Sequence, residues 1–160
     1  MGAAVNPFAN DPDRHAIWEM LVNRDIEAFL GRDWARVQDD FVAEAFFGLH
    51  AHFKPNPDDW TMEFPDLAVY RDEWLLQAEE TAATLYAEPL APAIFRATDL
   101  GVIEISGNRA LARKKFNGVI ARADGGDDRL DWQTLYICAK RDDRWKITSF
   151  VGYMPREMRG

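Results

Sequence analysis

Four long segments with strand-like alternation of apolar and polar residues fill the C-terminal part of the sequence. They span residues 94–106, 109–122, 129–140 and 145–154, and each gap between them is rich in Gly, Asn or Asp. Such residues favour the tight turns of β-hairpins, so the segments predict an antiparallel meander of four strands. Strands of this length must twist and bend, and Gly118 is a candidate position for a bend or bulge.

The N-terminal half has the apolar spacing that is typical of helices. Asp11 can cap a first helix, Pro12 fits its first position, and Gly31 fits the position after its end. A short second helix is expected over 34–45 and a third over 70–87. Helices followed by a long antiparallel sheet predict an α+β fold, in which the sheet curls around the helices and leaves a cavity on its concave face.

The segment between the second and third helices is less regular. Residues 46–53 are compatible with a helix end or a strand, whereas residues 54–59 contain two prolines and predict a loop. Pro89 and Pro92 are expected to end the third helix before the meander begins.

Length, charge and cysteine content limit the function classes. The chain has the length of one domain, over 1–160, in which residues 1–10 are expected to form a loose arm. Lys and Arg number 19 against 27 Asp and Glu, and the net charge of −8 disfavours nucleic acid as a partner. The single cysteine, Cys138, excludes a disulfide framework and a zinc finger. We expect a cytoplasmic protein without membrane contact, because no segment is apolar over the length of a membrane span and the N-terminus lacks a secretory pattern.

Two short stretches carry a family resemblance: GRDWARVQDDF at 31–41 and DRWKITSFVGYMP at 143–155. With the order of helices and strands, they resemble the nuclear transport factor 2-like superfamily, which includes ketosteroid isomerases, SnoaL-like polyketide cyclases and scytalone dehydratase. The resemblance implies a conical fold of three N-terminal helices packed on a long, bent antiparallel sheet with an internal pocket. It also implies a homodimer formed through the outer face of the sheet.

Asp25 is the most informative single position. At about 100° per residue it falls between Leu21 and Phe29, near the centre of the apolar face of the first helix. A carboxylate there must be paired, protonated or directed into a cavity. By the resemblance, it stands about where ketosteroid isomerases keep a hydrogen-bonding tyrosine. Asp25 is therefore a candidate catalytic residue, as a general base or a neutral acid, and the alternative is an internal salt bridge or hydrogen bond.

His50 and His52 flank Ala51, so in a strand both rings would lie on one side. Such a pair could share a metal or transfer protons, but no third ligand has suitable spacing and no metal is expected. By the resemblance, His50 lies close to the position of the isomerase's catalytic aspartate and is the second candidate catalytic residue. The alternative is that both histidines border the loop that follows.

Aromatic residues are numerous enough to line a small-molecule pocket. Alternation places Trp132, Thr134 and Tyr136 on one strand face, which we expect to point inward. For each aromatic residue the alternative is plain core packing. The candidate ligand-binding residues are Trp18, His52, Trp60, Tyr70, Trp74, Phe95, Phe116, Trp132, Thr134 and Tyr136.

Two departures from the family limit the chemistry. The Asp–His pair of dehydratase-like members would fall near Phe29 or Leu30 and near Phe95, and none of these is polar. The second acid of the isomerases would fall near Gln133 or Thr134, which can donate a hydrogen bond but are not acids. Steroid isomerisation by the usual set of residues is therefore not expected.

Two functional hypotheses follow. The first is a cofactor-independent isomerase, cyclase or lyase that moves a proton on a small hydrophobic, oxygenated molecule. Asp25 or His50 would be the base, and Tyr70, Thr134 or Tyr136 would hold the oxyanion. The second is a non-catalytic ligand-binding or dimerisation module. An open pocket beside Asp25 favours the first hypothesis, and a closed core with Asp25 in an internal ion pair favours the second. No cofactor is expected, because no nucleotide-binding or serine-nucleophile motif occurs.

Overall fold

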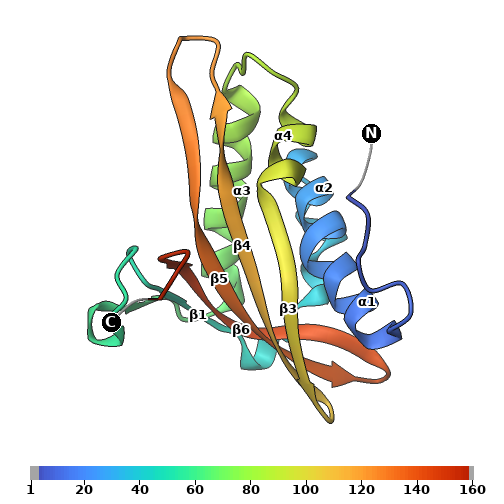
Figure 1. Cartoon of the computed structure of the whole chain (residues 1–160). Helices are drawn as coiled ribbons and strands as arrows, with labels where there is room; N and C mark the ends of the chain where they lie inside the picture. Colours follow the sequence, from blue (N-terminus) through green and yellow to red (C-terminus); the bar gives the residue numbers. More distant parts are fainter. Residues whose placement is uncertain (1–3, 159–160) are drawn as a thin grey trace.

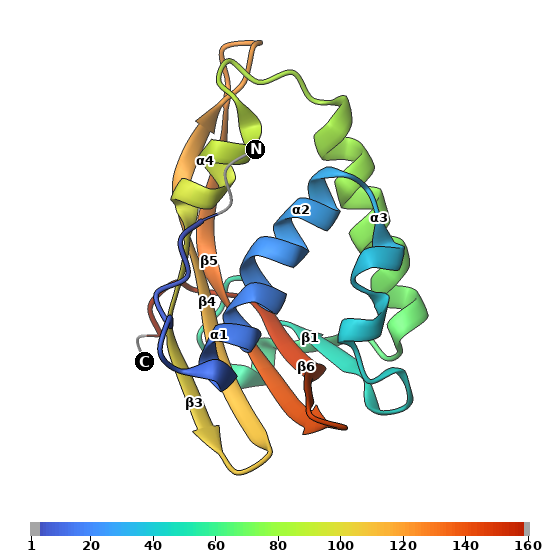
Figure 2. The same cartoon turned by 90° about the vertical axis from the view of Figure 1, so that its right-hand side faces the viewer.

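A bent six-stranded sheet with the order β2-β1-β6-β5-β4-β3 forms one layer of the molecule. The computed structural model describes residues 4–158, and its helices lie along one face of this sheet (Figures 1 and 2). Four antiparallel strands form most of the sheet, as the sequence predicts, and this α+β architecture confirms the predicted fold class. These strands are β3 (Thr98–Ser106), β4 (Arg109–Ala121), β5 (Asp127–Arg141) and β6 (Arg144–Met154).

Two short strands complete the sheet. The ambiguous segment contains β1 (Phe47–His50), which pairs in parallel with β6, and β2 (Thr61–Phe64) pairs antiparallel with β1. The short helical turn η5 (Pro57–Asp59) lies between them in the predicted loop. The concave face of the sheet therefore continues past the meander and carries the segment that contains His50.

The first helix begins where the sequence predicts. The Asp11 side chain accepts a hydrogen bond from the Arg14 backbone N–H at 3.2 Å, and the helix ends at Leu30 before Gly31. Its middle is wider than an α-helix, because the π-helical segment η1 (Glu19–Arg24) joins α1 (Pro12–Trp18) to α2 (Asp25–Leu30). Such π segments often occur at functional sites.

The predicted helix over 34–45 is wrong. Three separate turns replace it: η2 (Trp34–Arg36), η3 (Gln38–Asp40) and η4 (Ala43–Ala45). Contacts with distant parts of the chain cause this difference. The Val42 N–H donates to the Ile147 carbonyl at 2.9 Å. The buried Asp40 carboxylate accepts hydrogen bonds from Arg24 and Arg144. These bonds hold the segment against the sheet and prevent a continuous helix.

The third helix, α3 (Leu67–Ala83), begins and ends earlier than predicted. A further helix, α4 (Leu90–Ala97), is not predicted from the sequence, and its residues 94–97 replace the start of the first predicted strand of the meander. Its prolines do not oppose a helix, because Pro89 precedes it and Pro92 lies in its first turn, where no backbone N–H is needed.

Gly118 does not mark a bulge. It pairs in register with Leu130, and the pairing of β4 with β5 is continuous from Arg109 to Ala121. A Cβ atom on Gly118 would lie 2.7 Å from the Cβ atom of Ala97 at the end of α4. The glycine therefore allows α4 to pack closely against β4.

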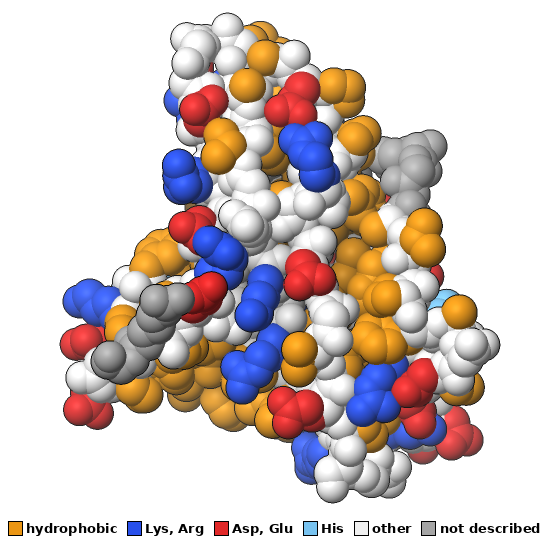
Figure 3. All heavy atoms as spheres, viewed as in Figure 1, with side chains coloured by type: hydrophobic (Ala, Val, Ile, Leu, Met, Phe, Trp, Pro, Cys, Tyr) orange, Lys and Arg blue, Asp and Glu red, His pale blue; other side chains and the backbone are white. Residues whose placement is uncertain are grey.

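The basic triplet 113–115 of β4 divides between the two faces of the sheet. Lys114 is buried on the concave side, whereas Arg113 and Lys115 are half-buried on the convex side. Figure 3 views the molecule from the convex side and shows basic side chains next to hydrophobic patches. Val102 and Leu111 contribute to this outer surface. A homodimer through this face stays a prediction.

The start of the chain packs on the first helix. The Ala4 backbone N–H donates to Oδ1 of Asn23 at 3.1 Å, so the described part of the predicted loose arm contacts the helix. Residues 1–3 of that arm lie outside the described residues. Among the helices of residues 4–158, none is long and apolar enough to cross a membrane.

Candidate functional site

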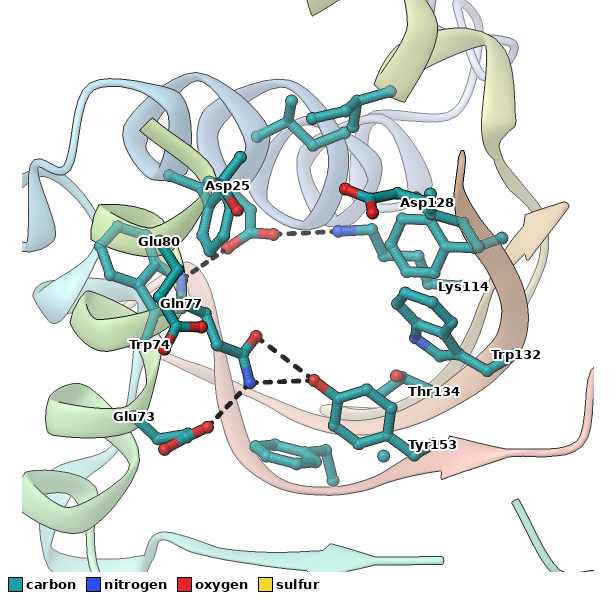
Figure 4. Close-up of a pocket in the computed structure, with 18 of the residues that line it drawn as sticks. Asp25, Glu73, Trp74, Gln77, Glu80, Lys114, Asp128, Trp132, Thr134 and Tyr153 are labelled. Carbon is teal, nitrogen blue, oxygen red and sulfur yellow. Dashed lines mark hydrogen bonds and ion pairs between the residues drawn. The ribbon is translucent and has the colours of Figure 1, made fainter. Parts of the chain in front are cut away.

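A cavity of about 370 Å³ lies between the concave face of the sheet and the helices α2 and α3 (Figure 4). Aromatic side chains form a large part of its wall, and they come from both helices and from β4, β5 and β6. The rings packed around it include those of Phe29, Phe64, Tyr70, Trp74, Phe116, Trp132, Tyr136, Phe150 and Tyr153.

An ion pair interrupts this aromatic wall. Nζ of Lys114 lies 3.0 Å from Oδ2 of Asp25 (Figure 4). The Lys114 side chain is 1% exposed and that of Asp25 is 29% exposed, so the cation is enclosed and the carboxylate borders open space. Charge compensation of this kind is what allows a carboxylate to lie in an apolar wall.

Lys114 is also held from the first helix. Its ammonium donates to the Leu21 carbonyl at 2.5 Å and lies 5.3 Å from the centre of the Phe116 ring. The Leu21 carbonyl belongs to the π-helical segment, immediately before the turn that carries Asp25. The local widening of the helix thus coincides with the place where a side chain from β4 bonds to its backbone.

The second oxygen of Asp25 is less engaged. Nε1 of Trp74 lies 3.5 Å from Oδ1, which is a long hydrogen bond. The indole is fixed by edge contacts with the rings of Phe29 and Trp34, at centroid distances of 5.5 and 5.2 Å. Asp25 therefore has one oxygen in a short ion pair and one with weak contact beside the cavity.

Two tyrosines offer neutral hydroxyl groups to the cavity. Burial raises the pKa of Tyr70 and of Tyr136 well above the ordinary value of 10.0, and the charge of Asp25 contributes in the same direction. Both hydroxyls therefore stay protonated near neutral pH and can donate hydrogen bonds.

Polar networks border the cavity away from the ion pair. Nε2 of Gln77 on α3 donates to the Tyr153 hydroxyl at 3.1 Å and to Glu73 at 3.0 Å (Figure 4). Elsewhere on the wall, the Tyr86 hydroxyl donates to Asp128 at 2.7 Å, and Arg122 pairs with the same carboxylate at 2.6 Å. These contacts fix side chains around the aromatic interior.

The structure brings seven of the predicted site residues to this cavity. They are Asp25, Tyr70, Trp74, Phe116, Trp132, Thr134 and Tyr136. The inward direction expected for alternate residues of β5 is thus the observed one.

Five predicted site residues lie elsewhere. Trp18 and Phe95 are buried in the main core, because α1 and α4 turn these rings toward the sheet away from the open space. Trp60 packs on the small cluster of Ala51, Val151 and Met154, and its Nε1 donates to the Lys54 carbonyl at 2.9 Å.

The remaining two, His50 and His52, form a stack beside the cavity. The His50 ring lies 4.3 Å from the His52 ring and 4.4 Å from the Tyr153 ring, and Tyr153 is the ring that reaches the cavity wall. Nδ1 of His50 accepts a hydrogen bond from the His52 backbone at 3.0 Å. Burial, followed by the charge of His52, lowers the pKa of His50 from 6.5. Within residues 4–158, no group of three or more His, Cys, Asp or Glu side chains is arranged to hold a metal.

Lys114 is the functional residue that sequence reasoning missed. The charged triplet to which it belongs suggests a solvated strand, but Ala110, Ala112 and Phe116 share its face of β4. A lysine in the middle of an apolar strand face signals a buried charge, just as Asp25 does on its helix. Together these two signals predict a pair, although each alone does not identify its partner.

Comparisons with known proteins show the fold and no specific activity. The chain is similar to a nuclear transport factor 2-like protein of unknown function from Shewanella baltica, with 17% identity, a TM-score of 0.52, and coverage of 89% of this chain and 94% of that one. It is also similar to a nuclear transport factor 2-like protein with a cystatin-like fold from Novosphingobium aromaticivorans, with 12% identity, a TM-score of 0.55, and coverage of 93% and 85%. A superfamily protein from Salmonella enterica has 16% identity and a TM-score of 0.54, with coverage of 90% and 91%. No protein-family model and no curated protein matches the sequence.

Proposed function

Because this chain has the nuclear transport factor 2-like fold, we propose that its cavity binds a small hydrophobic molecule that carries an oxygen group, and that Asp25 exchanges a proton with that molecule. The reaction would be an isomerisation or cyclisation that needs no cofactor. The observation that carries the proposal is a charge-compensated carboxylate on a cavity wall that is rich in aromatic rings.

The size and lining of the cavity support a small-molecule ligand. Ligand pockets usually have volumes of about 300–1,000 Å³ and mainly apolar walls, and this cavity of about 370 Å³ has such a volume and such a wall. Rings of Trp74 and Trp132 offer flat apolar contacts on opposite sides (Figure 4).

The environment of Asp25 supports proton transfer. Lys114 compensates its charge, and Oδ1 makes only the long contact with Trp74, so that oxygen can approach an acidic C–H bond of a ligand. Tyr70 and Tyr136 keep their hydroxyl protons and can donate to an oxygen of the same ligand. His50 has no such position, because it stacks behind Tyr153.

Deuterium exchange tests this proposal without knowledge of the natural substrate. Cyclic ketones and phenols would be screened for binding by saturation-transfer NMR, and the best ketone would then be incubated with the protein in D2O. We expect deuterium to enter next to the carbonyl group with the wild type. The Asp25→Asn variant should bind the ketone and lose the exchange, because the amide cannot accept the proton. Equal exchange rates in both proteins would contradict the proposal.

One observation favours a second function, in which the cavity binds a ligand without catalysis. Asp25 already has a short ion pair with Lys114, which is the arrangement of an internal salt bridge. This alternative predicts that ligands bind to the wild type and that no deuterium exchange exceeds the rate in buffer. The same experiment therefore separates the two functions.

A further inference from the structure

We propose that Lys114 is a second catalytic residue, whose ammonium donates a hydrogen bond to the carbonyl oxygen of the ligand and stabilises the enolate that forms when Asp25 removes a proton. This inference rests on the proposed function and names its substrate class: a neutral ketone or aldehyde with an acidic C–H bond next to the carbonyl group.

The hydrogen bonds of Lys114 leave room for such a contact. An ammonium group has three N–H donors and no acceptor. One donor is directed to the Leu21 carbonyl and a second to Oδ2 of Asp25. Lys114 is also one of the residues that line the cavity. Because the ammonium is enclosed, its third donor is left for a ligand oxygen that packs directly beside the Asp25 carboxylate.

Charge conservation makes the pair suitable for this step. Before the reaction, the Asp25 carboxylate and the Lys114 ammonium compensate each other. When the C–H bond breaks, its proton forms an O–H bond on Asp25, and its electron pair becomes the C=C bond of the enolate as the C=O bond becomes C–O⁻. Lys114 then compensates the enolate, while Asp25 is neutral. The Asp25–Lys114 site therefore keeps one positive and one negative charge throughout the step, so neither charge is left without compensation.

The charges that line the cavity also determine which class of ligand can bind. A carboxylate or phosphate ligand would bring a second negative charge next to Asp25, and Glu73, Glu80 and Asp128 also line the cavity. A neutral carbonyl compound adds no charge before the reaction. A hydrogen bond from an ammonium group to an oxyanion is also stronger than one from a neutral hydroxyl, so Lys114 would contribute more than Tyr70 or Tyr136.

A coloured phenol tests the inference without turnover. 4-Nitrophenol ionises near neutral pH, and its phenolate is a stable mimic of an enolate. Asp25→Asn imitates the state in which Asp25 has taken up a proton, because the amide is neutral and nearly the same shape. We expect this variant to bind nitrophenolate about tenfold more tightly than the wild type, because Lys114 then pairs with the bound anion in place of the Asp25 carboxylate.

Further variants make the experiment specific to Lys114. Asp25→Asn/Lys114→Met should lose the gain, and Asp25→Asn/Lys114→Gln gives the same comparison if the first double variant does not fold. Asp128→Asn removes another carboxylate from the cavity wall, one that pairs with Arg122 and Tyr86, and should show no such gain. Nitrophenolate binding that is equally tight without Lys114, or an equal gain in Asp128→Asn, would overturn the inference.

These outcomes differ from a failure of the proposed function. Absence of deuterium exchange in the wild type would contradict proton transfer by Asp25, and with it the catalytic role of Lys114. Exchange that persists while nitrophenolate binding is independent of Lys114 would overturn only the role given to Lys114.

Discussion

Asp25 and Lys114 are 89 residues apart in the sequence, yet Nζ of the lysine lies 3.0 Å from the carboxylate. The pair connects the N-terminal helix to β4 at the wall of the cavity. Its two members differ in exposure, because the lysine is 1% and the aspartate 29% exposed. Because only the carboxylate borders open space, loss of Asp25 and loss of Lys114 should affect the protein differently.

Loss of Asp25 should destabilise the fold more than loss of Lys114. Asp25→Ala leaves an enclosed ammonium without its counter-ion, and we expect a cost of about 3 kcal/mol. Lys114→Met leaves a carboxylate that borders the cavity, where water can solvate it, and the expected cost is about 1 kcal/mol. Urea unfolding of both variants measures the difference. The double variant should be more stable than Asp25→Ala alone, and the reverse order of the single variants would contradict this explanation.

The tyrosines should resist ionisation in the folded protein. The chain has four tyrosines. Burial is the main cause that raises the pKa of each, and the pKa of Tyr86 reaches about 12, with a contribution from the hydrogen bond to Asp128. The folded protein should therefore show little tyrosinate absorbance at pH 10, whereas the protein in guanidinium chloride should be about half ionised at that pH.

The same tyrosines predict alkaline unfolding. Because the folded-state pKa values are raised, the hydroxyls contribute full stability below pH 10 and lose it as the pH rises above 10 through the folded-state pKa values. Circular dichroism, recorded together with the absorbance, checks this. Half-maximal tyrosinate absorbance at pH 10 with an intact fold would contradict the burial of these rings.

His50 should make stability fall at mildly acidic pH. Burial and the neighbouring His52 lower its pKa, so the unfolded chain binds a proton more readily than the folded protein. Its contribution is complete above pH 6.5 and decreases as the pH falls below that value. Melting temperatures between pH 5 and pH 8 should therefore drop less on acidification in His50→Gln than in the wild type. The control is His15→Gln on the exposed part of α1, which should behave as the wild type.

Gly118 should not tolerate a methyl group. Gly118→Ala places a Cβ atom 2.7 Å from that of Ala97, so α4 must move away from β4. We expect a loss of about 1–3 kcal/mol in the free energy of unfolding. Ala97→Gly/Gly118→Ala removes the clash and should recover part of the loss. No recovery in the double variant would show that another contact causes the instability.

Local patterns in the sequence predict the meander and the first helix well. Alternation and turn residues specify the four strands, and Asp11 and Gly31 mark the ends of the helix. The segment 34–45 is mispredicted because its backbone bonds to β6, a partner that lies far away in the sequence. The short strand β1 depends on the same kind of parallel pairing with β6.

The candidate site is predictable in part. Asp25 stands out because a carboxylate on an apolar helix face needs a partner or a cavity, and the structure contains both. Its partner is not predictable from one strand pattern, because Lys114 lies within a basic triplet that looks solvated. The histidine pair also lacks a local signal for its position, since the stack on Tyr153 depends on how β1 and β6 meet.

The position of a bound ligand tests the central claim most directly. We would determine a crystal structure of the protein with the tightest-binding cyclic ketone from the NMR screen. We predict that the ketone occupies the aromatic cavity, with its carbonyl oxygen at hydrogen-bond distance from Nζ of Lys114 and its acidic carbon facing Oδ1 of Asp25. A ketone bound outside this cavity, or one inside it with both groups turned away from the ion pair, would contradict the account.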